Sequence, residues 1–69
     1  MRLDTDRIKK RLRHLKKRQT WLAQIVGVAD STVHDWLHGT FMPSYQHLNK
    51  IGKAIGLSWR TMIIEDEDK

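Results

Sequence analysis

The stretch from Gln19 to His38 constrains the fold of this chain more than any other part of its 69 residues. Residues three or four apart lie on one face of a helix, and apolar side chains recur at that spacing on both sides of Gly27. These apolar positions are Leu22, Val26, Val28, Val33 and Trp36. Glycine adopts a left-handed backbone conformation without a Cβ penalty, so Gly27 is expected to end the first helix. The pattern predicts two short helices that bury their apolar stripes against each other across a tight turn.

The small Ala23 follows Leu22 at the point where a second helix would cross closely. With these residues, the segment RQTWLAQIVGVADSTVHDWLHG resembles the helix-turn-helix of the lambda-type repressor and Cro family. Further along, Pro43 with Ser44 and the run LNKIGKAIGLSWRTMI resemble that family's fourth and fifth helices. The resemblance covers roughly residues 5 to 64. It implies an all-α, five-helix, lambda-repressor-like DNA-binding domain whose second motif helix enters the major groove.

Length and composition favour one small domain, because a chain this short buries only about 60% of its unfolded surface. We expect a DNA-binding domain over residues 1–64 and an acidic flexible tail over residues 65–69. The absence of cysteine excludes disulfides and thiolate metal sites, and it fits a reducing cytoplasm. No apolar run reaches the roughly 20 residues of a membrane span, and no apolar segment of a signal peptide is present. We therefore expect a cytoplasmic protein without a membrane partner.

The positive charge of the chain is concentrated in the expected domain. Residues 1–64 hold 12 Lys and Arg against 4 Asp and Glu, a net charge of +8, whereas residues 65–69 carry −3. Neutralising phosphates releases counterions and supplies most of a protein's non-specific affinity for DNA, so this balance favours a polyanionic partner. The alternative is that the charge only keeps the domain in solution.

A first helix is predicted from a cap at Asp4 or Thr5 to about Lys17. Its buried stripe is Ile8, Leu12 and Leu15. The rest of the helix surface is crowded with cations, which repel one another unless something neutralises them. These cations are Arg7, Lys9, Lys10, Arg11, Arg13, Lys16, Lys17 and Arg18. We expect Lys17 and Arg18, nearest the second helix, to contact DNA phosphates, and the alternative for individual members is a solvated basic face.

The second helix is expected to open at Gln19. In the family that the motif resembles, a glutamine here donates to a backbone phosphate, and the free N–H groups of the helix start point at the same oxygen. Thr20 is expected either to donate to a phosphate as well or to cap the helix. Trp21 stands where the motif is usually polar, so it either packs on the fifth helix or lies partly exposed near the DNA backbone.

The third helix, near Asp30 to Leu37, is expected to read the base sequence, with Val33 and Trp36 turned inward. Its outward face is Ala29, Asp30, Ser31, His34, Asp35 and His38. The family resemblance implies base contacts from Asp30, Ser31 and Asp35, with His34 beside them and Thr32 near the DNA backbone. Ala29 stands where the family usually has Ser or Thr, so Asp30 is expected to serve partly as the N-cap, in competition with base reading.

A carboxylate on this face needs a particular partner. Near phosphates it costs electrostatic energy unless it accepts from the N4 amino group of a cytosine. We expect Asp35 to make this contact. The alternative is that Asp35 only orients His34, Arg13 or another cation.

His34 and His38 lie one helical turn apart, a spacing at which two imidazoles can share a metal ion. No cysteine and no HExxH glutamate completes such a site, so we expect no metal ion there. Instead we expect the two imidazoles, partly protonated near neutral pH, to contact DNA or its phosphates. Beyond Gly39 the loop lacks Lys and Arg, so Thr40, Ser44 and backbone N–H groups are the candidate phosphate donors. Phe41 and Met42 form either an exposed apolar pair for a partner subunit or, for one of them, part of the core.

Family members often pair an arginine of the first helix with a glutamate near the end of the third, and Leu12 and Leu37 stand at the matching positions. We expect a hydrophobic contact in place of the ion pair. Ser44 is expected to cap a fourth helix, and Gly56 is expected to end it. Ser58 is expected to cap a last short helix that runs to about Ile64 and either covers the core or contacts a second subunit. The expected core is Ile8, Leu12, Leu15, Leu22, Ala23, Val26, Val28, Val33, Trp36, Leu48, Ile51 and Ile55.

Together these features predict a sequence-specific transcriptional regulator, a repressor or Cro-like protein. It would bind double-stranded DNA at a pseudo-palindromic operator as a homodimer, with recognition helices about 34 Å apart. No Gly-rich nucleotide loop or pair of catalytic carboxylates is present, so we expect neither an enzyme nor a cofactor or small-molecule ligand. The alternatives are a protein-interaction module and an antitoxin component with the same fold, and salt dependence of DNA binding separates the first alternative from a regulator.

Overall fold

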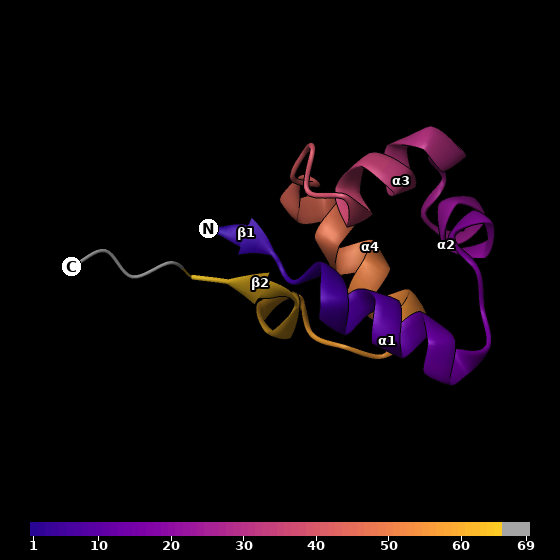
Figure 1. The fold of residues 1–69 in the computed structure, drawn as a ribbon, viewed down its shortest axis with the longest axis horizontal. Coiled ribbons are helices and arrows are strands. Elements are labelled where there is room, and N and C mark those ends of the chain that lie inside the picture. The colour runs from indigo at the N-terminus through magenta and orange to yellow at the C-terminus, as the bar shows by residue number, and fades with distance from the viewer. Residues whose placement is uncertain (66–69) are drawn as a thin grey trace.

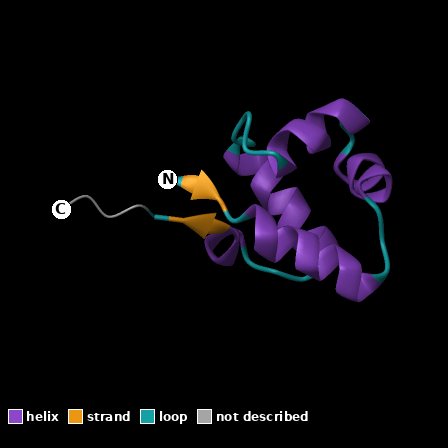
Figure 2. Ribbon diagram, in the orientation of Figure 1, coloured by secondary structure: helices purple, strands orange, loops and turns teal. Residues whose placement is uncertain are grey.

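Within residues 1–65, which the structure describes, four α-helices enclose one apolar core and two short strands pair (Figure 1). The structure is a computed structural model. In chain order its elements are β1 (Arg2–Leu3), α1 (Thr5–Leu15), α2 (Gln19–Val26), α3 (Asp30–Leu37), α4 (Tyr45–Ile55), the 3-10 helix η1 (Trp59–Met62) and β2 (Ile63–Ile64) (Figure 2). No helix in this part of the chain has the length and apolar character needed to cross a membrane. Of the expected acidic tail, only Glu65 lies within the described residues, and it is exposed.

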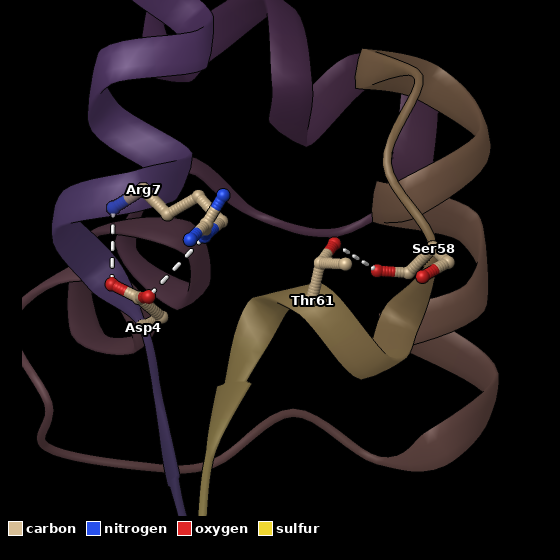
Figure 3. Close-up of polar contacts among 4 residues, drawn as sticks. All are labelled: Asp4, Arg7, Ser58 and Thr61. Atoms are coloured by element: carbon tan, nitrogen blue, oxygen red, sulfur yellow. Dashed lines mark hydrogen bonds and ion pairs between the residues drawn. The ribbon is translucent and has the colours of Figure 1, made fainter.

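The first helix begins where Asp4 caps it. The Asp4 carboxylate accepts hydrogen bonds from the Arg7 backbone N–H at 3.1 Å and from the Arg7 guanidinium Nε at 3.4 Å (Figure 3). The first of these bonds satisfies an N–H group that a helix start otherwise leaves without a partner. The helix ends at Leu15, and Lys16 follows in a left-handed conformation with φ of 60°. This end lies slightly before the expected one at about Lys17.

The next three helices have the expected boundaries. Gly27, with φ of 87°, ends α2, and α3 covers Asp30–Leu37 as the sequence predicts. Ser44 caps α4 because its hydroxyl oxygen accepts a backbone N–H of the first turn at 3.3 Å. Gly56, with φ of 79°, ends the same helix. These boundaries follow from local signals, namely a capping hydroxyl and glycines that adopt positive φ.

The prediction of a fifth α-helix is wrong. After Ser58 the chain makes only one 3-10 turn, in which the Ser58 carbonyl oxygen accepts from the Thr61 backbone N–H and from Thr61 Oγ1, at 3.1 and 2.8 Å (Figure 3). The Ser58 side chain makes no cap hydrogen bond. Ile63 and Ile64 then extend as β2, since β-branched residues favour a strand where a pairing partner is available. The fold therefore has four α-helices, and a short turn and strand take the place of the fifth.

The partner of this strand is the start of the chain. Arg2 pairs with Ile64 and Leu3 with Ile63 in an antiparallel ladder, and β1 and β2 lie side by side in Figure 1. The Asp4 backbone N–H extends the ladder by donating to the Met62 carbonyl oxygen at 2.7 Å. The pairing places Leu3 in the core, a position that the sequence pattern did not reveal.

One apolar cluster joins all four helices and η1. Its buried members are Leu3, Ile8, Leu12, Leu22, Ala23, Val26, Val33, Trp36, Leu37, Leu48, Ile51, Ile55 and Met62. Of the residues expected in the core, Leu15 and Val28 are half-buried and pack against this cluster, and the others are buried.

Gly52 allows η1 to lie close to α4. Its carbonyl oxygen accepts the backbone N–H groups of Gly56 and Leu57 at 2.8 and 2.9 Å, so the chain doubles back directly over it. A Cβ at Gly52 would overlap the Leu57 carbonyl oxygen and lie 3.2 Å from Cε of Met62. A side chain here would therefore push the following turn away from the core.

Candidate nucleic-acid interface

α3 buries one face and presents the other. Val33, Trp36 and Leu37 are buried against the core, which fixes the rotation of the helix about its axis. Of the residues expected on its outward face, Asp35 is half-buried and the others are exposed. The exposed residues are Ala29, Asp30, Ser31, His34 and His38. Thr32 is also half-buried. The polar side chains of α3 are therefore displayed on a rigid support.

Asp30 does not cap α3. Ala29 is the N-cap residue, and its carbonyl oxygen accepts the backbone N–H groups of Thr32 and Val33 at 3.0 and 3.3 Å. Asp30 already has helical geometry, so its carboxylate cannot occupy the capping position that the sequence suggested. The carboxylate is exposed and has no hydrogen-bond or ion-pair partner within residues 1–65. It is therefore available to a ligand.

The imidazoles of His34 and His38 stack, with ring centroids 3.9 Å apart and an interplanar angle of 29°. His38 Nδ1 lies 2.9 Å from the His34 carbonyl oxygen, an acceptor, so Nδ1 is the nitrogen that donates. This bond uses Nδ1, so Nε2 is the ring nitrogen of the exposed His38 that remains available to a ligand. Within the described residues, no group of three or more His, Cys, Asp or Glu is placed to hold a metal ion.

The Asp35 carboxylate makes no hydrogen bond or ion pair within residues 1–65, so neither His34 nor Arg13 is oriented by it there. The Asp35 backbone carbonyl oxygen accepts from the Thr40 N–H at 2.9 Å, which closes the end of α3.

α2 also begins without a side-chain cap. Arg18 occupies the N-cap position in an extended conformation, and its side chain makes no capping bond. Thr20, which is exposed, lies inside the helix, so the expectation that it caps the helix is wrong. Gln19 is half-buried at the first helical position. The first N–H groups of both motif helices thus lack side-chain partners, whereas Asp4 and Ser44 cap α1 and α4.

A hollow of about 290 Å³ lies beside the start of α2, and we call it the basic hollow. Its lining residues are Lys9, Leu12, Arg13, Lys17, Arg18, Gln19 and Leu37. Leu12 and Leu37 are both buried, so apolar side chains occupy the two positions where the family often has an ion pair. The cations of the hollow are thus not matched by any carboxylate in its lining.

Trp21 contacts Lys17, one of the cations that line the basic hollow. Its ring is half-buried against the core, and the Lys17 ammonium lies 5.3 Å from the ring centroid. A cation over an indole face is attracted by the ring quadrupole, so this contact holds Lys17 near the start of α2.

The loop after α3 exposes its apolar residues. Phe41 is 62% and Met42 39% exposed, whereas Pro43 is buried. Neither Phe41 nor Met42 joins the core, so the expectation that one of them packs inside is wrong. Thr40 is exposed beside them.

Arg11 has a structural role that its place in a run of cations concealed. Its guanidinium Nε donates to the Ile55 carbonyl oxygen at 2.7 Å, at the end of α4. Such a bond satisfies one of the carbonyl groups that a helix end leaves without a partner. No signal in the sequence separates Arg11 from its basic neighbours, because its partner is 44 residues away.

Comparisons with known proteins bear on this surface. The profile of the helix-turn-helix family matches residues 8–61. The crystal structure of the P22 c2 repressor in complex with a synthetic operator matches with a TM-score of 0.83 and 29% identity, covering 96% of this chain and all of that chain. The solution structure of the P22 c2 repressor DNA-binding domain matches with a TM-score of 0.77 and 30% identity, over 86% of this chain and 78% of that one. No curated protein sequence gives a significant match.

Proposed function

The chain belongs to the helix-turn-helix family, and from this premise we propose that it represses transcription by binding a pseudo-palindromic operator as a homodimer. It is a DNA-binding transcriptional regulator. The observation that carries the proposal is the polar face of α3, exposed on a helix whose other face is anchored by Val33 and Trp36. The likeness to the P22 c2 repressor, whose crystal structure contains a synthetic operator, supports operator binding by this chain.

We assign base recognition to Asp30, Ser31, His34 and Asp35 of α3. The major groove is wide enough to admit a helix, and each base pair presents a distinct pattern of donors and acceptors there. The two carboxylates can accept from the N4 amino group of cytosine, whereas the hydroxyl and the imidazole can donate or accept. The absence of partners for Asp30 and Asp35 within residues 1–65 supports this assignment.

Phosphate contacts surround α3 in this proposal. We assign them to Lys17, Arg18, Gln19, Thr20, Thr32, His38 and Thr40. The first four lie at or just before the start of α2, where uncapped backbone N–H groups add their own attraction for an anion. These contacts fix the register of the protein on DNA but carry no sequence information directly.

We propose the homodimer on the basis of the short recognition helix and the geometry of DNA. A single α3 contacts few base pairs, and two copies on one face of the duplex place their recognition helices about 34 Å apart. We propose that residues 1–64 form the whole DNA-binding domain and that it acts in the cytoplasm, where a repressor reaches its operator.

Selection of binding sites from random duplex DNA tests the proposal. We expect two related half-sites of inverted symmetry, with centres one helical turn apart, and a protein-to-DNA ratio of two to one on the selected site. The Val33→Asp variant is unsuitable as a control, because it would unfold the core. Ser31→Arg, on the exposed face, should keep the fold and change the selected sequence. Failure to enrich any sequence at low ionic strength would contradict the proposed function.

A further inference from the structure

The cations of α1 divide between two sides of the helix. On one side, Arg7 pairs with Asp4, Arg11 binds the Ile55 carbonyl oxygen, and Lys10 lines a hollow that also contains the carboxylates of Asp4 and Asp6. On the other side, Lys9, Arg13 and Lys17 line the basic hollow, whose lining contains no carboxylate.

The second side is a regular stripe. Lys9, Arg13 and Lys17 are spaced by four residues, which places their side chains along one side of α1 and its C-terminal end. The side chains of Lys9 and Arg13 make no hydrogen bond or ion pair within residues 1–65. Like charges at this spacing destabilise a helix by a few tenths of a kcal/mol per pair, so the stripe opposes folding unless an anion neutralises it.

Lys9 connects this stripe to the end of α3. Besides the basic hollow, Lys9 lines a neighbouring hollow of about 460 Å³ that also includes His38, Phe41 and Met42. The loop of residues 39–44 contributes no Lys or Arg to this region. The stripe therefore lies between two groups already assigned to phosphates, the start of α2 and His38.

We propose that Lys9 and Arg13 bind DNA backbone phosphates, so that the contacted strand runs from the start of α2 across α1 to the end of α3. Leu12 and Leu37 line the basic hollow with uncharged side chains, so no carboxylate of its lining repels the phosphate. The inference rests on the proposed function and adds two phosphates to the interface.

The salt dependence of DNA binding tests this assignment. The variant K9Q/R13Q removes two charges from the basic hollow, and K10Q/K53Q removes two charges elsewhere, with Lys10 on the carboxylate-lined side of α1 and Lys53 exposed on α4. The association constant for a random duplex is measured at salt concentrations from about 50 to about 200 mM. Its logarithm is plotted against the logarithm of the salt concentration to give the slope. For K9Q/R13Q we expect the slope to fall in magnitude by about 2, since each phosphate contact contributes about 0.9.

The outcomes separate the two levels of the proposal. K10Q/K53Q should keep the slope of the unaltered protein to within about 0.5, a margin set below the contribution of one contact. Equal slopes for the two double variants would overturn the assignment of Lys9 and Arg13 and leave the proposed function intact. An unaltered protein that binds no duplex even at low salt would instead contradict the proposed function itself. The variant K9R/R13K, which keeps both charges, should restore the slope, and circular dichroism verifies that each variant is folded.

Discussion

At the scale of single residues, α3 is unusual for a surface that meets a polyanion, because two of its polar groups are carboxylates. Asp30 and Asp35 have no partner within residues 1–65, and they are therefore not explained by the internal bonding of the described chain. Base recognition gives each of them an acceptor role that phosphate contact could not.

The variant Asp35→Ala is expected to relax the preference at one C·G pair of the operator, by about 1–3 kcal/mol, because the cytosine N4 amino group loses its acceptor. Site selection from random DNA gives the preference at each position. Asp6→Ala, at an exposed position on the far side of α1, should leave the selected sequence unaltered. A consensus that is identical for Asp35→Ala and the unaltered protein would show that Asp35 reads no base.

At the scale of elements, the helices whose limits depend on local chemistry were predictable and the C-terminal segment was not. Gly27, Ser44 and Gly56 mark helix ends by their own conformational preference or hydroxyl group. The segment from Ser58 onward becomes a 3-10 turn and a strand because Arg2 and Leu3, at the other end of the chain, offer a pairing partner. Periodicity within a short window cannot contain that information.

The same limit applies to the candidate interface. Helical spacing predicted that Val33 and Trp36 face inward and that His34 faces outward. It could not distinguish Arg11, which binds the end of α4, from Arg13, which lines the basic hollow, because the difference lies in which element packs beside each. The failure of Asp30 to cap α3 is a shift of one residue in the helix start, beyond what cap preferences resolve.

The variant Gly52→Ala tests how closely η1 is seated on α4. In an ordinary helix interior this change stabilises a protein by about 0.5–1 kcal/mol. Here the added Cβ would overlap the Leu57 carbonyl oxygen, so we expect a loss of about 1–3 kcal/mol in the free energy of unfolding. Chemical denaturation provides the measurement, with Lys53→Ala on the exposed side as control. Stabilisation by Gly52→Ala would show that the turn is not held against the helix.

At the scale of the whole molecule, the pairing of β1 with β2 joins the first and last elements of the described chain beside a small apolar core. Leu3 is only 7% exposed, belongs to the apolar cluster of the core and pairs with Ile63 of β2. A domain of this size buries a modest share of its surface, so each such contact is a large part of its stability.

The variant Leu3→Ala is therefore expected to lower the free energy of unfolding by about 2–5 kcal/mol, since it leaves a cavity in the core. Thermal unfolding followed by circular dichroism measures the loss, and Met1→Ala is the matched control because Met1 is 69% exposed. If Leu3→Ala melted at the same temperature as the control, the strand pair would contribute nothing to global stability.

The uncapped starts of α2 and α3 have a consequence for anyone who sets out to make this protein more heat-tolerant. Aspartate or serine at position 18 or 29 is the obvious improvement, because a capping side chain adds about 1 kcal/mol to a helix. At position 18 the new oxygen would accept hydrogen bonds from the backbone amides of α2 that are proposed to bind an operator phosphate, so a more stable helix would bind DNA less tightly. Substitutions that raise thermal stability are better placed in the core or in the β1–β2 pair, because they do not use hydrogen-bond donors that are proposed to bind DNA.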